Sequence, residues 1–331
     1  MSALLHAPEA AVVSQPERVG GGLPGGGPAR RGKRRSGRGV SGTARQQTIN
    51  AWVFLAIPIV LFVAFLAIPI VTALVLSFSD YSVLGSLSWT GIDNYVQLVN
   101  DPFFWIALRN TAFYTVLYVP LGLVVALATA LLLNRSTRAA RIFRTLFYIP
   151  VVSSTVATAS IWFWLLNPQY GIFNVVLSWF GIDGPAWLYD SKWAMLAIVM
   201  MSVWAGFGAN MIIFLGGLQG VSPDLHEAAR LDGANAWQAF WHVTLPGISR
   251  TTLLVTTLLI IGAFQVFDQA YVLTKGGPGN STLTLVYLIY NEGFGALKMG
   301  YASAISFVLF LIILVFSIVN ARISNPKGAR A

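Results

Sequence analysis

Long apolar segments alternate with short polar stretches through most of this chain. Six of them approach or exceed the roughly 20 residues with which a helix crosses a ~30 Å hydrocarbon core. They cover residues 52–78, 107–133, 145–166, 194–218, 251–273 and 301–319. The pattern therefore predicts an all-α, polytopic membrane protein with about six transmembrane helices.

Prolines interrupt three of these segments, at Pro58, Pro69, Pro120 and Pro150. A proline removes a backbone hydrogen bond, and inside a membrane neighbouring helices re-satisfy the freed carbonyl. The segments are therefore expected to pack as a bundle. Composition agrees, because charged residues make up only 10% of the chain, against about 25% in soluble domains. The chain has no cysteine, which excludes disulfides and cysteine-based metal sites.

Changes in composition divide the chain into four regions. Residues 1–49 are rich in glycine, proline and arginine, and they are expected to form a disordered basic cytoplasmic tail that anionic membrane lipid attracts. Residues 50–106 supply the first transmembrane helix and an external loop, 107–320 a core of five helices, and 321–331 a second cytoplasmic tail. The first apolar segment is too long for a signal peptide and lacks a small-residue cleavage site.

A stretch of the first tail superficially matches a nucleotide phosphate loop. It runs from Gly27 to Arg34, but it ends in arginine where magnesium binding requires serine or threonine, and no strand precedes it. We therefore expect no nucleotide or other cofactor in this chain. The net charge of +9 does not predict a nucleic-acid partner either. The basic residues gather on one predicted side of the membrane, as they do in membrane proteins generally.

The distribution of lysine and arginine sets the direction of the helices. If the first residue is inside, the inner side carries 17 of the 21 basic residues, and the outer side carries Arg109, Lys192, Lys275 and Lys298. Membrane proteins concentrate lysine and arginine on the cytoplasmic side. Both termini and the stretch at 219–249 are therefore predicted to be cytoplasmic.

The outward loops combine carboxylates with tryptophans. They hold Asp80, Asp93, Asp101, Asp183 and Asp190, together with Trp89, Trp105, Trp179, Trp187 and Trp193. Tryptophans at such positions usually form a belt at the membrane interface. They also suit a docking surface for an external protein, and the sequence leaves both interpretations open.

The cytoplasmic stretch at 219–249 is longer and more polar than a turn between spans requires. Ser222 is typical of a helix cap, and Pro223 of the first helical position. The helix that they open is expected to run to about Asp232, where Gly233 permits a turn. The sequence therefore predicts a short cytoplasmic helix between two spans.

A second short helix is predicted directly after this turn. Asn235 and Gln238 fit a capping box. The helix is expected to end before Pro246, since the residue before a proline disfavours helical geometry. Two interpretations stay open on spacing alone: the two helices protrude at a sharp angle, or they form an amphipathic loop on the membrane surface. His226 and His242 have no partners at metal-ligand spacing, so both are expected to be ordinary surface residues.

The same stretch resembles the EAA loop of ABC importer permeases. The resemblance rests on Glu227-Ala228-Ala229, then three residues, Gly233, nine residues, and Val243-Thr244-Leu245-Pro246. The family usually has isoleucine in place of Val243. Residues 267–278 and 300–304 are similar to the subfamily that takes up sugars and glycerol phosphates. The whole resemblance covers about residues 50–320, and it implies the type I importer permease fold for the 107–320 core.

The resemblance assigns roles to individual residues of this loop. It implies that Glu227 is the polar contact to a separate ATPase subunit. Ala228 and Ala229 would be small packing residues, and Gly233 would form the bend. Asp232, Leu245 and Pro246 complete the predicted ATPase-coupling loop.

The resemblance also implies a set of partners. These are a second homologous permease subunit, a homodimeric ATP-binding subunit that holds ATP and magnesium, and an extracytoplasmic substrate-binding protein. The complex would reside in the bacterial cytoplasmic membrane. It would import a sugar, a polyol or a glycerol-phosphate compound.

Polar residues within the apolar segments are the candidates for a substrate path, because charges and amides in a membrane are costly. Gln265 and Asp268 are three residues apart and share a helix face. Phe264 is adjacent, and Asn210 lies in the fourth segment. Amides and carboxylates beside aromatic rings suit a hydroxyl-rich ligand, and the lack of a cation in these segments favours a neutral sugar. Alternatively, Asp268 caps a helix at the outer interface.

Two other function classes fit the sequence less well. A secondary transporter needs coupling carboxylates at mid-membrane depth or an inverted repeat, and only Asp268 is a candidate. An integral membrane enzyme needs paired carboxylates, a metal cluster or a nucleophile with its base, and the sequence contains no such set. The permease of an ATP-driven importer, itself without catalytic residues, is therefore the favoured function.

Overall fold

The fold is described from a computed structural model, which defines residues 40–82, 85 and 87–323. The chain divides into two units, Met1–Val60 and Leu61–Ala331. Most of the two predicted tails lies outside the described residues.

The first unit is described only where it forms helix α1, which spans Val40–Phe62 and continues into the second unit. The predicted boundary of the basic tail at residue 49 is therefore wrong for residues 40–49, which are helical. Alanine, arginine and glutamine in this stretch have favourable helix propensities, and they extend the helix toward the N-terminus.

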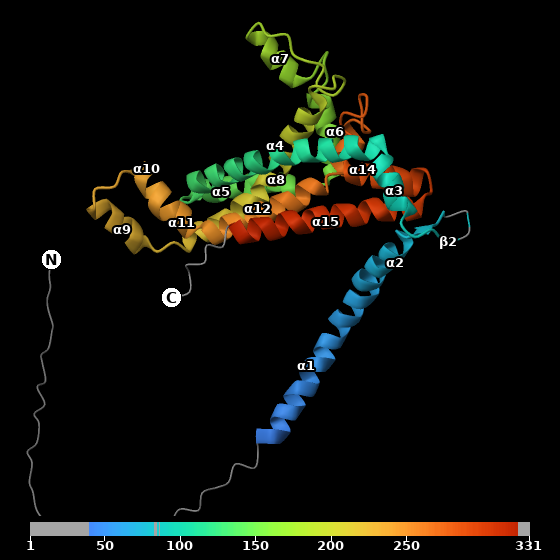
Figure 1. The fold of residues 1–331 in the computed structure, drawn as a ribbon. Coiled ribbons are helices and arrows are strands. Elements are labelled where there is room, and N and C mark those ends of the chain that lie inside the picture. The colour runs from blue at the N-terminus through green and yellow to red at the C-terminus, as the bar shows by residue number, and fades with distance from the viewer. Residues whose placement is uncertain (1–39, 83–84, 86, 324–331) are drawn as a thin grey trace, which may run out of the picture. The chain divides into compact units, whose positions relative to one another are not determined.

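The second unit is almost entirely helical (Figure 1). Its helices are η1 (Val63–Ala67), α2 (Ile68–Leu76), α3 (Asp93–Asn100), α4 (Pro102–Leu133), α5 (Arg138–Val152), α6 (Thr155–Leu165), α7 (Ile172–Trp179), α8 (Ala194–Gln219), α9 (Pro223–Leu231), α10 (Ala236–Ala239), η2 (Phe240–Thr244), α11 (Leu245–Gly247), α12 (Ser249–Phe264), α13 (Asp268–Leu273), α14 (Leu285–Tyr290), η3 (Asn291–Gly295) and α15 (Met299–Ile323). Two short antiparallel strands, β1 (Ser79–Asp80) and β2 (Ser88–Trp89), follow α2. The all-α prediction is confirmed.

The described helices provide four to six membrane crossings. Four are long and apolar enough to cross a membrane, and two bent helix pairs raise the number to six if each pair is one span. The predicted spans are not all straight, however. Helices α5 and α6 meet at 100°, because the backbone becomes extended at Ser153, three residues after Pro150. The predicted segment at 251–273 is also interrupted, between Phe264 and Asp268.

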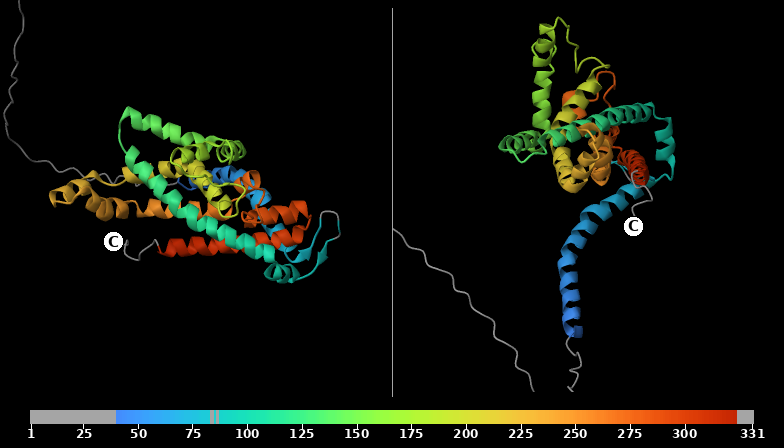
Figure 2. Two further views of the ribbon diagram at one scale, coloured as in Figure 1. Left: turned by 90° about the horizontal axis from the view of Figure 1, so that it is seen from above. Right: turned by 90° about the vertical axis from the view of Figure 1, so that its left-hand side faces the viewer.

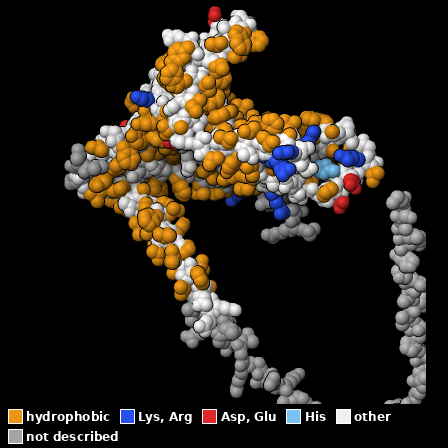
Figure 3. Space-filling model, turned by 180° about the vertical axis from the view of Figure 1, so that it is seen from behind, with side chains coloured by type: hydrophobic (Ala, Val, Ile, Leu, Met, Phe, Trp, Pro, Cys, Tyr) orange, Lys and Arg blue, Asp and Glu red, His pale blue; other side chains and the backbone are white. Residues whose placement is uncertain are grey.

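Helices α4, α8, α12 and α15 form the centre of the bundle and lie side by side (Figures 1 and 2). Small residues allow this close approach. Ala126 and Ala130 of α4 are fully buried, and a Cβ atom at Gly208 of α8 would collide with the Phe147 carbonyl of α5. Large apolar side chains cover the outside of the bundle instead (Figure 3). Such a surface is typical of a protein whose solvent is lipid.

Two prolines follow π-helical turns in the described chain. Helix η1 ends two residues before Pro69, and η2 ends two residues before Pro246. A proline ring clashes with the carbonyl of the preceding turn of an α-helix, and a wider π turn at that place relieves the clash. The chain therefore stays helical through Pro246. The prediction that the second cytoplasmic helix ends before this proline is wrong for this reason.

The tryptophans of the loops predicted to face outward divide into two groups. Trp89, Trp105, Trp179 and Trp193 are exposed, as expected for a belt or a docking surface. Trp187 is buried instead, and its Nε1 donates a hydrogen bond of 2.6 Å to Asn174 Oδ1. Trp187 is therefore part of the core that holds the loop after α7 against the bundle.

Candidate functional site

Residues 222–247, which we call the elbow, project beyond the ends of α4 and α15 (Figures 1 and 2). The first elbow helix, α9, begins as predicted. Ser222 Oγ accepts a hydrogen bond from the Asp224 backbone N–H at 3.3 Å, and Pro223 occupies the first turn. Asp224 places a carboxylate at the positive end of the helix dipole, which stabilises this start.

The end of α9 is closed by a Schellman motif. The Ala234 N–H donates to Ala229 O at 2.9 Å, and the Gly233 N–H donates to Arg230 O at 3.1 Å. Gly233 has φ +81, a left-handed conformation that glycine adopts without a Cβ penalty. The predicted bend at Gly233 is therefore confirmed.

The second half of the elbow opens with the predicted capping box. The Gln238 N–H donates to Asn235 Oδ1, and the Asn235 N–H donates to Gln238 Oε1, both at 2.9 Å. Helices α10, η2 and α11 then follow without interruption as far as Ile248, which is buried. The elbow therefore consists of two helical limbs that meet at Gly233.

A side-chain contact that the sequence did not reveal joins the two limbs. His226 Nε2 of α9 lies 3.2 Å from Thr244 Oγ1 of η2, at hydrogen-bonding distance, and Thr244 is buried. His226 is thus not an ordinary surface residue, although His242 makes only a local contact to Gln238 O at 2.9 Å. The sequence signal was weak, since the two residues lie 18 positions apart.

The elbow is firmly rooted in the bundle. A Cβ atom at Gly247 would lie 2.9 Å from Val221 Cγ2, so the entering and leaving chains touch. One turn deeper, a Cβ atom at Gly217 of α8 would collide with the Thr251 side chain of α12. Interiors packed this closely transmit displacement instead of absorbing it. A push on the elbow is therefore expected to move α8 and α12 together.

The predicted coupling residues lie on this projecting part. Glu227 and Ala228 are exposed on α9, and Ala229 is half-buried. Asp232 and Gly233 are exposed at the bend.

Leu245 is half-buried and Pro246 is exposed near the root of the second limb. Aromatic side chains add apolar surface to the same limb, because Trp237 and Trp241 are exposed and pack with ring centroids 5.6 Å apart. An exposed carboxylate beside apolar surface on a rigid support suits a protein contact.

The break between α12 and α13 holds two of the predicted substrate-path residues. Gln265 and Asp268 flank the non-helical residues and both are exposed. The Val266 carbonyl, which the break leaves without a helical partner, accepts a hydrogen bond of 2.9 Å from the buried Thr284 Oγ1. Asp268 lies in the first turn of α13, where no side chain caps the helix. A broken helix whose backbone is satisfied by other elements is typical of transporter binding sites.

Aromatic rings that the sequence did not single out form a cluster at the start of α13, the helix that begins at Asp268. Phe267 stacks on Tyr271 with ring centroids 5.3 Å apart, and Tyr290 lies 5.2 Å from Phe267 and 5.4 Å from Tyr271. Desolvation raises the pKa of the neighbouring Tyr287 hydroxyl, so this group remains a neutral hydrogen-bond donor. Tyr271 and Tyr290 are exposed, so their rings are open to a ligand in the same region as Asp268. Tyr271, three residues after Asp268, was the available sequence signal.

The two other substrate-path candidates lie in the protein interior. Asn210 is buried, and its Nδ2 donates to Gly206 O at 3.3 Å. Phe264 is 3% exposed, and its ring packs 5.3 Å from the ring of Phe316. Of the four candidates, only Gln265 and Asp268 are open to a ligand in this conformation.

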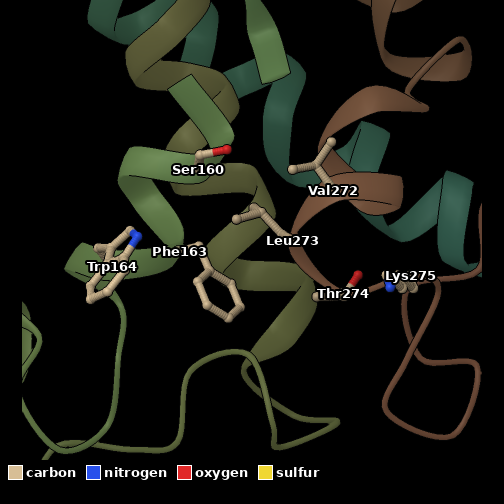
Figure 4. Close-up of a pocket in the computed structure, with 7 residues that line it drawn as sticks. All are labelled: Ser160, Phe163, Trp164, Val272, Leu273, Thr274 and Lys275. Atoms are coloured by element: carbon tan, nitrogen blue, oxygen red, sulfur yellow. The ribbon is translucent and has the colours of Figure 1, made fainter. Parts of the chain in front are cut away.

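A cavity of about 450 Å³ lies between α6 and α13 (Figure 4). Its lining includes Phe163 and Trp164 of α6 and Val272 and Leu273 of α13. Thr274 Oγ1 is already engaged, since it donates to Ala270 O at 2.9 Å and lies 2.7 Å from Thr282 Oγ1. The cavity is therefore mainly apolar, and it offers a polar ligand less than the break does.

No group of three or more histidine, aspartate or glutamate side chains within the described residues is arranged to hold a metal ion. The chemistry available at the two sites is therefore of two kinds. The elbow offers a protein-docking surface. The break offers hydrogen bonds and aromatic faces to a polar ligand.

Comparison with known proteins identifies the family. Residues 118–325 match the family described as "Binding-protein-dependent transport system inner membrane component". The chain is 39% identical over 284 residues to the lactose transport system permease protein LacF of Rhizobium radiobacter, which covers 84% of this chain and 94% of that protein. It is 34% identical over 281 residues to the arabinooligosaccharides transport system permease protein AraP of Bacillus subtilis, with 84% and 89% covered.

A solved structure shares the fold. The chain matches a bacterial ABC transporter involved in the import of the acidic polysaccharide alginate with a TM-score of 0.73 and 24% sequence identity, over 85% of this chain and 97% of that chain. The fold is thus that of an ABC importer permease. This chain belongs to the family of inner membrane components of binding-protein-dependent transport systems, and it is a multi-pass membrane permease.

Proposed function

We propose that this permease imports a sugar or a related polyol into the bacterial cytoplasm, as one of two homologous permease subunits of an ATP-driven complex. A homodimeric ATPase would bind ATP and magnesium, and this chain would bind neither. An extracytoplasmic protein would deliver the substrate. The two relatives named above carry the names of lactose and arabinooligosaccharide systems, which supports a carbohydrate as the cargo.

The observation that carries this proposal is the elbow. It exposes Glu227 on a short helix whose base is packed between α8 and α12. Closure of the ATPase dimer would push on this helix and rock the spans between inward-open and outward-open states. The described residues thus supply a mechanical contact, and the partner supplies the chemical energy.

A charge reversal on the elbow tests this coupling. We expect Glu227→Lys to lower ATP-driven uptake in vesicles and ATPase co-purification by roughly tenfold or more, since breaking an interfacial charge contact costs about 2–5 kcal/mol. Asp183→Lys is the matched control for co-purification, because it reverses an exposed carboxylate outside the elbow, in the loop between α7 and α8. Equal co-purification and uptake in Glu227→Lys and the parent would refute the docking role. Proton-dependent uptake by this chain without ATP would refute the importer proposal as a whole.

The break supports a hydroxyl-rich cargo. Gln265 and Asp268 offer an amide and a carboxylate, and Tyr271 and Tyr290 expose rings beside them. Sugars present hydroxyls at their edges and an apolar face, so they fit such a combination of groups. We propose that the cargo passes this break, with the buried Phe264 directly before it, and that Asn210 lies on the same path.

The proposed orientation places both termini and the elbow in the cytoplasm. The absence of cysteine from the chain allows a direct test with single cysteines at two exposed serines. Ser191→Cys should react with a membrane-impermeant maleimide in intact cells, and Ser222→Cys should react only after lysis. The opposite labelling pattern would reverse the orientation.

A further inference from the structure

A basic pocket lies next to the root of the elbow. Its cavity is about 500 Å³ and is lined by Asn134, Arg135, Ser136, Arg141, Arg144 and Gln219. Every lining residue is polar, and three of the six are arginines. The pocket is formed by the turn between α4 and α5, the first turns of α5 and the last residue of α8.

One of the three arginines has an evident structural role. Arg144 Nη2 donates to Leu133 O at 2.6 Å and to Arg135 O at 3.1 Å, so it closes the C-terminal end of α4. These acceptors are uncharged carbonyls, and the positive charge of Arg144 is therefore not neutralised. Its guanidinium adds to the field in the pocket while it holds the turn in place.

The other two arginines have no such role. Arg135 and Arg141 are exposed in the pocket wall. Within the described part of the chain, the one ion pair joins Lys298 to Glu292, so none of the three arginines has a carboxylate partner there. Like charges gathered in one pocket repel each other, and a bound anion relieves that repulsion. Binding of an anion would therefore stabilise this cluster of arginines.

The position of the pocket indicates which anion. The apolar spans of α4 and α8 end at Leu133 and Gln219, so the pocket lies at the boundary between the hydrocarbon core and water. Exposed apolar residues of α5, Ile142 and Phe143, adjoin the arginines in the chain. Lysine and arginine side chains gather at this end of the bundle (Figure 3). Guanidinium groups bind phosphate oxygens in pairs with matching geometry.

We propose that this pocket binds a phosphate group, supplied by the headgroup of an anionic phospholipid or by a free phosphate ester of the cytoplasm. The phosphate oxygens accept hydrogen bonds from Arg135 and Arg141, and Ser136 and Gln219 complete the wall. A ligand held there ties the α4–α5 turn to the last residue of α8, three positions before the elbow. Its occupancy stiffens the root through which the elbow moves α8.

The test is a thermal-shift titration of the purified full-length chain in detergent. The probes are dioctanoyl-phosphatidylglycerol, dioctanoyl-phosphatidylcholine and inorganic phosphate. The anionic phosphatidylglycerol should raise the unfolding temperature of the protein more than the zwitterionic phosphatidylcholine does. Arg135→Gln/Arg141→Gln should lower the apparent affinity for the anionic probe by roughly tenfold or more. Arg138→Gln/Arg250→Gln is the matched control, because it removes the same charge from outside the pocket.

The outcomes distinguish the sources of the phosphate. Stabilisation by phosphatidylglycerol alone identifies a lipid headgroup, and arginine-dependent stabilisation by inorganic phosphate identifies a free phosphate ester. Equal affinity in the pocket pair and the control pair would overturn the proposal, as would equal effects of both lipids together with no arginine-dependent effect of inorganic phosphate. If the pair serves to bind an acidic surface of the ATPase, Arg135→Gln/Arg141→Gln would lower co-purification and leave the titration unchanged, which also overturns it.

A second variant keeps the test decisive if the double substitution prevents folding. Ser136→Asp retains all three arginines and adds a negative charge to the pocket wall. This substitution should lower the apparent affinity for phosphatidylglycerol by a similar factor and leave the response to phosphatidylcholine unchanged. An unaltered phosphatidylglycerol titration in Ser136→Asp would count against the pocket as a phosphate site.

Discussion

The elbow and the break between α12 and α13 both interrupt the apolar helices, but they are held in different ways. In the elbow, Ser222, Gly233 and Asn235 close each turn through neighbours within a few positions. In the break, the freed carbonyl of Val266 depends on Thr284, 18 residues later. The elbow is thus a unit of local structure that can move as one body. The break has its shape only within the assembled bundle.

Apart from the charge reversal at Glu227, the largest effect on uptake is expected from a substitution that removes the local shape of the elbow. Gly233→Ala places a Cβ at φ +81, which costs about 1–2 kcal/mol for an L-residue, and it should lower ATP-driven uptake roughly tenfold. Gly216→Ala is the matched control, since a Cβ at this helical glycine meets no atom within 4 Å. Uptake in vesicles and the amount of inserted protein are the measurements. Full uptake in Gly233→Ala would mean that the bend does not transmit the motion.

Substitutions in the break are expected to change the affinity for substrate, and not the contact with the ATPase. Gln265→Ala and Asp268→Asn each remove one proposed hydrogen bond, worth about 0.5–1.5 kcal/mol, so the KM for uptake should rise roughly threefold to tenfold. ATPase co-purification should not change. Gln269→Ala, at a half-buried residue next to Asp268, is the control. An unchanged KM in both variants would remove the break from the substrate path and leave the proposed role of the elbow unaffected.

Local signals made the elbow largely predictable from sequence. The serine cap, the turn at Gly233 and the capping box of Asn235 all appear as expected, because each depends on residues within one or two turns. The end of the second limb was not predictable in the same way. Whether a helix ends at Pro246 depends on whether the preceding turn widens into a π turn. We attribute that widening to the packing around the buried Thr244 and Ile248.

Long-range contacts limited what could be predicted elsewhere. The long apolar segments of the sequence located the spans, but they could not show that α5 and α6 meet at 100°. Gln265 and Asp268 were found because polar groups are rare in such segments. Tyr290 could not be predicted as part of this site, because only the fold brings its ring centroid within 5.4 Å of that of Tyr271. Aromatic residues are also common throughout this chain. The position of Phe264 in the core likewise depends on Phe316.

A moderate effect is expected from the contact that holds the break. Thr284→Val keeps the side-chain shape but removes the hydroxyl that donates to Val266 O at 2.9 Å. A buried carbonyl left without a partner costs about 1–3 kcal/mol, so the unfolding temperature should fall and substrate affinity should weaken with it. Thr252→Val is the control, because its hydroxyl only donates to Ile248 O within the same helix turn. Equal stability of the two variants would show that the break is held by other contacts.

The smallest effect is expected from the contact between the limbs of the elbow, and it tests whether local structure alone defines this unit. His226→Ala removes the partner of Thr244 Oγ1, a hydrogen bond worth about 0.5–1.5 kcal/mol. Because the caps of α9 remain, the helix should persist while its amides exchange hydrogen up to roughly tenfold faster. His242→Ala is the control, since His242 contacts only Gln238 of its own limb. If both variants exchange alike, the caps alone hold the limbs together. If α9 unfolds completely in His226→Ala, the elbow depends on a contact 18 residues apart, and in that respect it resembles the break.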